Sequence, residues 1–425
     1  MSRFSPMQHR RCIALPRLFR SIAAMAVVAM SGLLLFTASA AAADDSDGPP
    51  SASVGVVYVE SNITSANSIL AYTRGKNGTL TPLPGSPFST HGKGVIDPSL
   101  KLGPFDADQL IVANPQRTLL FAVNPGSNTV AAFHIRPDGT LYDVEGSPFP
   151  SGGSNPVSLG LSRGTLVVVN KAMDPQQPTG QVPNYVSFDV TADGKLIPTP
   201  VSTIAVPVGN SPSQALVAPS QRLVFGADFL GGLLQSFQVD FEGALLHNAP
   251  QALPASEFAG SAAPPLPLGL TVHPNRAVVY VGFVTINKVG VYLYDDFGKL
   301  SFVRTVADSG TAVCWLRMNA EGTRLYASNT GDNSISVFDT TDPLSPREIQ
   351  HIALRGDGSS FQIELDPRGE YLFAVSQRAD AATPLGKGNN LHVLRVLDDG
   401  RLAQSKGPLA LPVPGDVRPQ GLATF

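Results

Sequence analysis

The chain has 425 residues, of which only 15% are charged, and its formal net charge is −3. Such sparse and balanced charge excludes the strongly basic surface on which nucleic-acid binders depend. The 40 glycines and 37 prolines favour an all-β protein with many turns over a helical one.

Residues 1–43 have the pattern of a signal peptide. A basic stretch, "MSRFSPMQHRRCIALPRLFR", precedes the apolar "SIAAMAVVAMSGLLLFTASA", and small residues follow at the spacing of a cleavage site. An uncleaved membrane anchor is the alternative, although the apolar stretch is short for a span. We therefore expect export to the periplasm or the exterior, an acidic linker over residues 44–52, and no stable membrane insertion after cleavage. Cleavage would leave Cys314 as the one cysteine, which excludes an intramolecular disulfide.

Residues 53–425 are built from a repeated unit. A turn that launches a short strand recurs as "KNGTL", "PDGTL", "ADGKL", "FEGAL", "DFGKL" and "DDGRL". Successive turns are about 50 to 60 residues apart, except before the last, where the gap is about twice as long and holds "TTDPLSPREI" instead. The spacing therefore predicts seven units.

Each unit carries further strands before this turn. Runs such as "LLFAVN", "VVYVGF" and "RLYASN" are aromatic and β-branched, and after a polar loop each is followed by a similar run such as "NTVAAF", "VGVYLY" or "SISVFD". An earlier strand opens the unit, as in "LGLTVHP", "CWLRMNA" and "FQIELDP". Four strands at this period predict a β-propeller of seven four-stranded antiparallel blades.

The two ends of residues 53–425 predict how the ring closes. The first strand, "VGVVYVES", matches the second strand of a unit, whereas the terminal "VRPQGLATF" matches a first strand without successors. We therefore expect the C-terminal strand to join the N-terminal blade, which would also protect an exposed strand edge.

The segments "RLYASNTGDNSISVFD" and "LLFAVNPGSNTVAAFHIRPDGTLYDVEGSPFPSGG" resemble blades of the seven-bladed lactonase-type propellers. That family includes 6-phosphogluconolactonase and carboxymuconate-cyclase proteins and the related YVTN-repeat proteins, and the resemblance covers nearly all of residues 53–425. It implies that enzymes of the family carry "PHxH", "GPRH" and a further Arg-His pair on innermost strands, where they bind a carboxylate and act on the lactone ring. This chain departs from all three motifs. The corresponding positions hold Ser211 and Ser213, Leu268 and Gly269, and Phe361 and Gln362.

Four long insertions predict which face of the propeller carries the binding site. In a propeller, the loop from the second to the third strand lies on the same side as the loop between blades. Residues 170–184 and 376–390 extend the first kind of loop, and residues 89–108 and 254–268 extend the second kind. Because binding residues concentrate on loops of a rigid scaffold, we predict that this channel face binds the partner. The alternative is that the insertions are functionally neutral.

Two charged residues are predicted to lie inside the channel. Arg317 in "CWLRMNAEG" and Glu364 in "FQIELDPRG" occupy equivalent positions on the innermost strands of neighbouring blades. They can therefore meet as a structural ion pair, which would avoid the cost of burying either charge alone. The alternative is a ligand-contacting or acid–base role. Nearer the loop-rich mouth, the candidates for contact with a solute, each with blade packing as its alternative, are Trp315, Gln362, Arg418 and Gln420.

The histidines predict no metal site. No close pair with metal-ligand spacing occurs among the six of residues 53–425, which are His91, His134, His247, His273, His351 and His392. The Asn and Asp residues of "NPGSNT" and "NTGDNS" are better explained by turns than by calcium. We expect no cofactor.

Two functions remain open. The first is an exported, monomeric propeller that binds a small molecule, polymer or protein at the channel face without turnover, and binds no nucleic acid. The second is an enzyme acting on lactones or cyclic acids, in which Arg317 anchors a carboxylate and Glu364 is the base. The missing Arg-His motifs favour the first.

Overall fold

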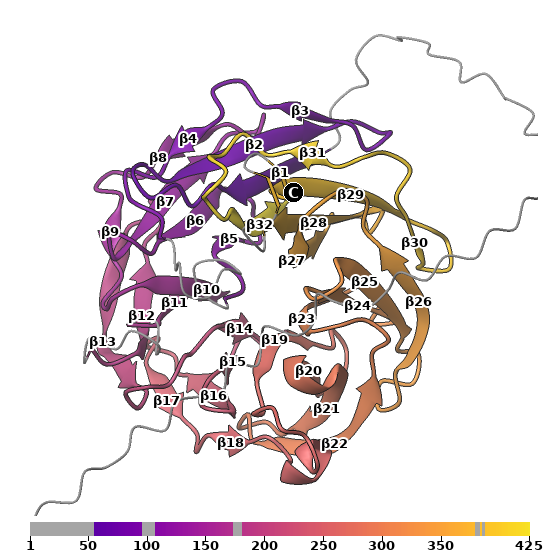
Figure 1. The fold of residues 1–425 in the computed structure, drawn as a ribbon. Helices are drawn as coiled ribbons and strands as arrows, with labels where there is room; N and C mark the ends of the chain where they lie inside the picture. Colours follow the sequence, from indigo (N-terminus) through magenta and orange to yellow (C-terminus); the bar gives the residue numbers. More distant parts are fainter. Residues whose placement is uncertain (1–54, 96–106, 173–180, 379–382, 385–386) are drawn as a thin grey trace, which may run out of the picture. The chain divides into compact units, whose positions relative to one another are not determined.

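The computed structural model describes residues 55–95, 107–172, 181–378, 383–384 and 387–425. The predicted signal peptide and linker lie outside these residues. The described chain forms seven antiparallel sheets arranged as blades around a central channel (Figure 1), so the predicted propeller is confirmed. Four of the sheets have a short fifth strand that pairs with the third strand of the blade.

The first three blades run from the channel outward as follows. Blade 1 consists of β32 (Gln420–Thr424), β1 (Gly55–Glu60), β2 (Ser68–Arg74) and β3 (Leu80–Pro82), with β4 (Phe88–Ser89). Blade 2 consists of β5 (Ile111–Ala113), β6 (Leu119–Asn124), β7 (Thr129–Ile135) and β8 (Leu141–Asp143), with β9 (Phe149–Pro150). Blade 3 consists of β10 (Pro156–Ser162), β11 (Thr165–Asn170), β12 (Asn184–Val190) and β13 (Leu196–Ala205).

The other four blades repeat this order. Blade 4 consists of β14 (Leu216–Val217), β15 (Leu223–Asp228), β16 (Leu233–Val239) and β17 (Leu245–His247), with β18 (Gln251–Ala252). Blade 5 consists of β19 (Pro267–Val272), β20 (Val278–Phe283), β21 (Lys288–Tyr294) and β22 (Leu300–Ala307). Blade 6 consists of β23 (Val313–Met318), β24 (Arg324–Asn329), β25 (Ser334–Asp339) and β26 (Arg347–Ala353). Blade 7 consists of β27 (Ser359–Leu365), β28 (Tyr371–Gln377), β29 (Asn390–Val396) and β30 (Leu402–Ala403), with β31 (Leu409–Ala410).

The C-terminal strand closes the ring as predicted. Strand β32 pairs antiparallel with β1, and Tyr58 faces Ala423 in the register. On the other side, the Thr424 hydroxyl donates to the carbonyl of Leu365 in blade 7 over 2.7 Å. The N-terminal blade thus takes its innermost strand from the far end of the sequence, which protects the inner edge of β1.

Apolar side chains and buried tyrosines hold neighbouring blades together. Between blades 6 and 7, for example, Ile335 and Val337 pack in one buried cluster with Ile363 and Leu372. Tyrosine hydroxyls cross between blades to backbone carbonyls, since a buried hydroxyl needs a partner. These bonds join Tyr58 to Gly139 (2.7 Å), Tyr280 to Pro343 (2.8 Å) and Tyr326 to Gly400 (3.0 Å).

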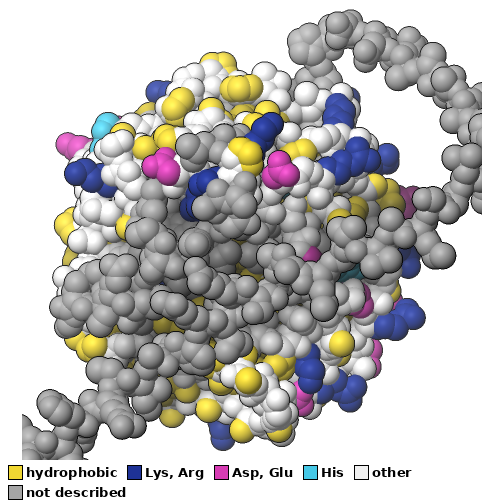
Figure 2. Space-filling model, in the orientation of Figure 1, with side chains coloured by type: hydrophobic (Ala, Val, Ile, Leu, Met, Phe, Trp, Pro, Cys, Tyr) yellow, Lys and Arg dark blue, Asp and Glu magenta, His cyan; other side chains and the backbone are white. Residues whose placement is uncertain are grey.

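Helical structure is limited in the described chain to two short 3-10 turns, η2 (Ala255–Phe258) and η3 (Val284–Ile286). Within the described ranges, no helix is long and apolar enough to cross a bilayer. On the face shown in Figure 2, basic and acidic side chains are interspersed around the rim. That distribution matches the low charge of the sequence.

Candidate functional site

The channel has two mouths that differ in structure. Each innermost strand starts at the connection from the preceding blade, and all except the C-terminal β32 end at a short turn into the second strand. We call the first end the insertion mouth, because the described parts of the connections 89–108 and 254–268 lead into innermost strands there. We call the second end the turn mouth, because it is bordered by turns such as 114–118 and 366–370.

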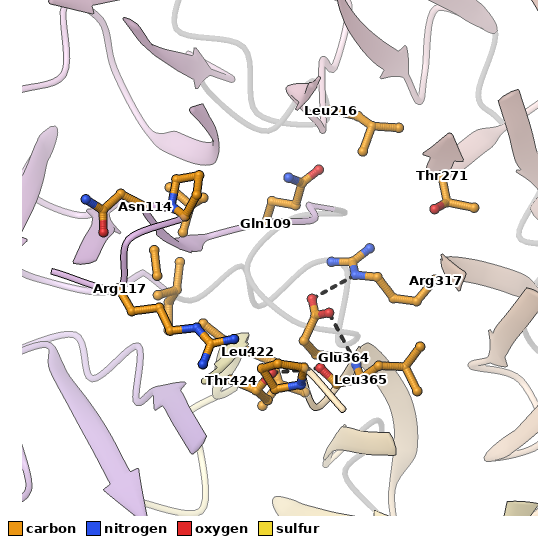
Figure 3. A pocket seen from close by; sticks show the side chains of 16 residues that line it. Gln109, Asn114, Arg117, Leu216, Thr271, Arg317, Glu364, Leu365, Leu422 and Thr424 are labelled. Atoms are coloured by element: carbon orange, nitrogen blue, oxygen red, sulfur yellow. Dashed lines mark hydrogen bonds and ion pairs between the residues drawn. The ribbon is translucent and has the colours of Figure 1, made fainter. Parts of the chain in front are cut away.

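Arg317 and Glu364 lie side by side near the turn mouth. Arg317 is the fifth residue of β23, and Glu364 is the sixth residue of β27 in the next blade. The Arg317 Nε donates to Glu364 Oε2 over 2.9 Å (Figure 3). Their side chains are 14% and 29% exposed, so both groups retain some contact with solvent.

Arg317 has a second carboxylate partner, Asp108, which the sequence did not reveal. Asp108 ends the connection from blade 1 to blade 2, and its side chain is completely buried. The two terminal nitrogens of Arg317 donate to the two oxygens of Asp108 over 2.9 and 3.0 Å, a bidentate arrangement. The amide of Gln214 also donates to Asp108, over 3.2 Å. The Arg317 guanidinium is therefore held by two carboxylates at once.

These contacts set the ionisation of the arginine and of Glu364. Burial alone would lower the pKa of Arg317, but the two carboxylates outweigh it and raise the pKa above its usual value. Burial raises the pKa of Glu364, and the neighbouring Arg317 reverses only part of that shift. Arg317 is thus permanently charged, whereas Glu364 takes up a proton more readily than a free glutamate.

Trp315 and Gln362 are packed against the chain rather than open to solvent. The Trp315 indole nitrogen and the Gln362 amide both donate to the carbonyl of Ala107, over 2.7 and 2.8 Å. The indole ring also packs on Phe361, with ring centroids 4.6 Å apart. Residues 107 and 108 therefore occupy the channel between the innermost strands. Whether Trp315 or Gln362 contacts a ligand stays a prediction.

Arg418 and Gln420 lie on the insertion side of β32. Gln420 is 1% exposed and Arg418 is half-buried. Burial, followed by the nearby charge of Arg378, lowers the pKa of Arg418. The backbone carbonyl of Arg418 accepts a hydrogen bond from Asn62 over 3.0 Å. Their predicted role in binding is likewise untested.

A cavity of about 430 Å³ opens at the turn mouth, opposite to the insertion mouth. Figure 3 shows Arg117 across the cavity from the Arg317–Glu364 pair. Arg117 lies in the turn after β5 and is exposed, and its guanidinium makes no hydrogen bond or ion pair with the described residues. Other polar groups on the wall come from Gln109, Asn114, Thr271 and Thr424, and apolar groups come from Ile111, Leu216, Leu365 and Leu422.

The position of Gly269 explains why one family motif is absent. Gly269 in β19 has a φ of +63°, and an added Cβ would lie 2.1 Å from the carbonyl oxygen of Cys314. No side chain fits there without moving the backbone of blade 6. Ser213 is similarly engaged with its own blade, because its hydroxyl donates to the carbonyl of Ala227 over 3.2 Å.

Residues 267–414 match the family described as lactonase, 7-bladed beta-propeller. This match supports the predicted resemblance to the lactonase-type propellers over blades 5 to 7. It is 23% identical over 284 residues to a 6-phosphogluconolactonase of Yersinia enterocolitica, which covers 64% of this chain and 78% of the relative.

Solved structures share the lactonase-type fold. A putative 6-phosphogluconolactonase of Bacteroides uniformis superposes with a TM-score of 0.67 at 15% identity, covering 87% of this chain and 99% of the other. A periplasmic gluconolactonase of Pseudomonas aeruginosa has a TM-score of 0.63 at 17% identity, with the same coverage of 87% and 99%. At these identities the similarity shows the fold alone.

Proposed function

We propose that this lactonase-type propeller is exported and binds a small hydroxylated ring compound, such as a sugar lactone, in the cavity at the turn mouth. The cavity walls combine amides and hydroxyls with one carboxylate, two arginines and several aliphatic groups. Such a surface suits a ligand with many hydroxyl groups and an apolar ring face. The relatives named as 6-phosphogluconolactonase and gluconolactonase support this ligand class. The signal-like residues 1–43 and the periplasmic relative support export.

The saturation of Arg317 favours binding over turnover. In the enzymatic alternative this arginine anchors the carboxylate of a cyclic acid, but its terminal nitrogens already face Asp108 and its Nε faces Glu364. An incoming carboxylate would have to displace a buried partner, which is costly. This single observation carries the proposal.

One observation favours the enzymatic alternative. Glu364 lines the cavity, and burial raises its pKa, as general bases and acids often require. In that case Glu364 would activate a water molecule or transfer a proton at the lactone ring.

Calorimetry and a turnover assay on the purified protein test the choice. We expect glucono-δ-lactone or a related lactone to bind, with binding weakened by Arg117→Ala and Glu364→Gln. The exposed Arg347 on β26 offers a matched control, so Arg347→Ala should bind like the wild type. We expect no hydrolysis above the uncatalysed rate. Hydrolysis that is lost in folded Arg317→Ala and Glu364→Gln proteins would overturn the binding proposal in favour of the enzyme.

A further inference from the structure

A second group of chemically active side chains lies far from the channel, at the junction of blades 5 and 6. Asp308 directly follows β22, the outermost strand of blade 5, and Glu348 and His351 lie on β26, the outermost strand of blade 6. One potential metal-binding atom from each of the three residues lies within 4.8 Å of the others.

A β-bulge brings Glu348 and His351 to one face of β26. Residues three apart on a regular strand point to opposite faces. In the pairing with β25, His351 is opposite Ser336 and Glu348 is opposite Phe338. Three positions on β26 thus correspond to only two on β25, and the extra residue is Ile349. The bulge therefore turns both side chains to the face that carries Ser336.

Asp308 contributes a buried carboxylate oxygen that has no partner. The residue is 6% exposed, and its Oδ1 accepts from the Gly310 amide over 2.7 Å and from the Ser336 hydroxyl over 2.8 Å. Its Oδ2 is buried and has no hydrogen-bond donor among the described residues. A buried charged oxygen without a donor is costly unless a cation binds to it.

A carboxylate also lies near His351, as it does near many metal-binding histidines. The Asp332 carboxylate lies 3.6 Å from Nε2. A carboxylate at one ring nitrogen orients the imidazole and leaves the other nitrogen for a metal. That other nitrogen, Nδ1, lies 3.2 Å from the Ser309 hydroxyl, which also donates to Glu348 over 2.6 Å.

We propose that Asp308, Glu348 and His351 form a binding site for a divalent transition-metal ion of the Zn²⁺ type. Three protein ligands and a water molecule complete the tetrahedral coordination that this ion prefers. The two carboxylates balance the charge of the ion, and the imidazole favours it over Ca²⁺ and Mg²⁺. Because the ligands come from two blades, the ion would fasten blade 5 to blade 6.

Titration of the EDTA-treated full chain with Zn²⁺ tests the site. We expect one Zn²⁺ per chain and a rise in the midpoint of thermal unfolding, since an ion that binds only the folded state stabilises it. His351→Gln changes a partly exposed side chain and should remove the rise. Asp332→Asn, which alters only the orienting carboxylate, should weaken binding by about 10-fold to 100-fold.

Two further variants separate the site from adventitious binding. Asp308→Asn keeps an acceptor for Gly310 and Ser336 but removes the charge, so it should abolish Zn²⁺ binding without lowering the stability of the metal-free protein. His91→Gln alters the exposed pair of His91 and Asp143, which are 3.0 Å apart, and should leave binding unchanged. Binding of Zn²⁺ that is equally strong in His351→Gln and Asp308→Asn would overturn the proposal. Tighter binding of Ca²⁺ than of Zn²⁺ would also overturn it.

Discussion

Replacing Asp108 should destabilise the propeller far more than replacing Glu364, the other carboxylate that Arg317 contacts. Asp108 is fully buried and accepts two hydrogen bonds from Arg317, at 2.9 and 3.0 Å. In Asp108→Asn, an amide NH₂ would face the guanidinium, and the partly buried cation would keep only Glu364. Breaking one side of a buried pair costs about 3–5 kcal/mol, a large part of the 5–15 kcal/mol that stabilises a typical domain.

Equilibrium unfolding in urea measures the effect. Glu364→Gln should cost about 1 kcal/mol or less, because the Glu364 side chain is 29% exposed and water screens its charge. Asp143→Asn offers a matched surface control, since Asp143 is 47% exposed, and should change the free energy of unfolding by less than about 0.5 kcal/mol.

A double variant isolates the pair itself. Asp108→Asn combined with Arg317→Met should cost less than the sum of the two single changes, because residues in contact are not additive. A cost below about 1 kcal/mol for Asp108→Asn would refute the view that this buried pair holds the channel together.

The remaining predictions concern ring closure, a glycine and a histidine. Deleting residues 420–425 removes β32, exposes the edge of β1 and leaves the buried Leu422 contacts unmade, so circular dichroism should show a loss of at least about 3 kcal/mol in stability. An unchanged unfolding curve would contradict the closure. Gly269→Ala should destabilise well beyond the 1–3 kcal/mol of backbone strain alone, because its Cβ would meet Cys314, whereas Gly209→Ala, at φ +92° with open space around it, should show only the strain. Equal losses would contradict the steric argument. Burial lowers the pKa of His392 to about 4 from a usual value near 6.5, so the unfolded chain binds the proton first and the stability should fall by up to about 3 kcal/mol as pH drops from 6.5 to 4. His392→Gln should flatten that part of the curve of unfolding free energy against pH.

The fold followed from the sequence because propeller blades repeat. Each blade forms its strands from local patterns of aromatic and β-branched residues, and the spacing of the turns counts the blades. Alignment of one blade with the next also predicted that Arg317 and Glu364 would meet, because equivalent residues of neighbouring innermost strands lie side by side. Features that recur from blade to blade could therefore be predicted from the sequence.

The features that the sequence did not reveal lie where the repeat is broken. Asp108 reaches Arg317 from a connection 209 positions earlier, and no periodic pattern marks that connection. Residues three apart on a regular strand lie on opposite faces, but the bulge at Ile349 puts Glu348 and His351 on the same face. Their spacing in the sequence therefore did not suggest a metal site. At Gly269, the sequence shows that the family motif is replaced. Only the structure shows that this residue has a positive φ and lies against the carbonyl of Cys314.

The described cavity lies at the turn mouth, and its two arginines constrain the ligand. Arg317 lines the cavity but is committed to Asp108 and Glu364, so an acidic group of a ligand cannot gain from it without breaking a buried pair. Arg117 is the cavity's arginine without a partner in the described chain, and an acidic group would have to approach it instead. Arg117→Ala should therefore weaken an aldonate far more than the neutral lactone, whereas Glu364→Gln should weaken both through their hydroxyl groups. If Arg117→Ala weakened the binding of the lactone and of the acid equally, Arg117 would not be the residue that an acidic group of the ligand contacts.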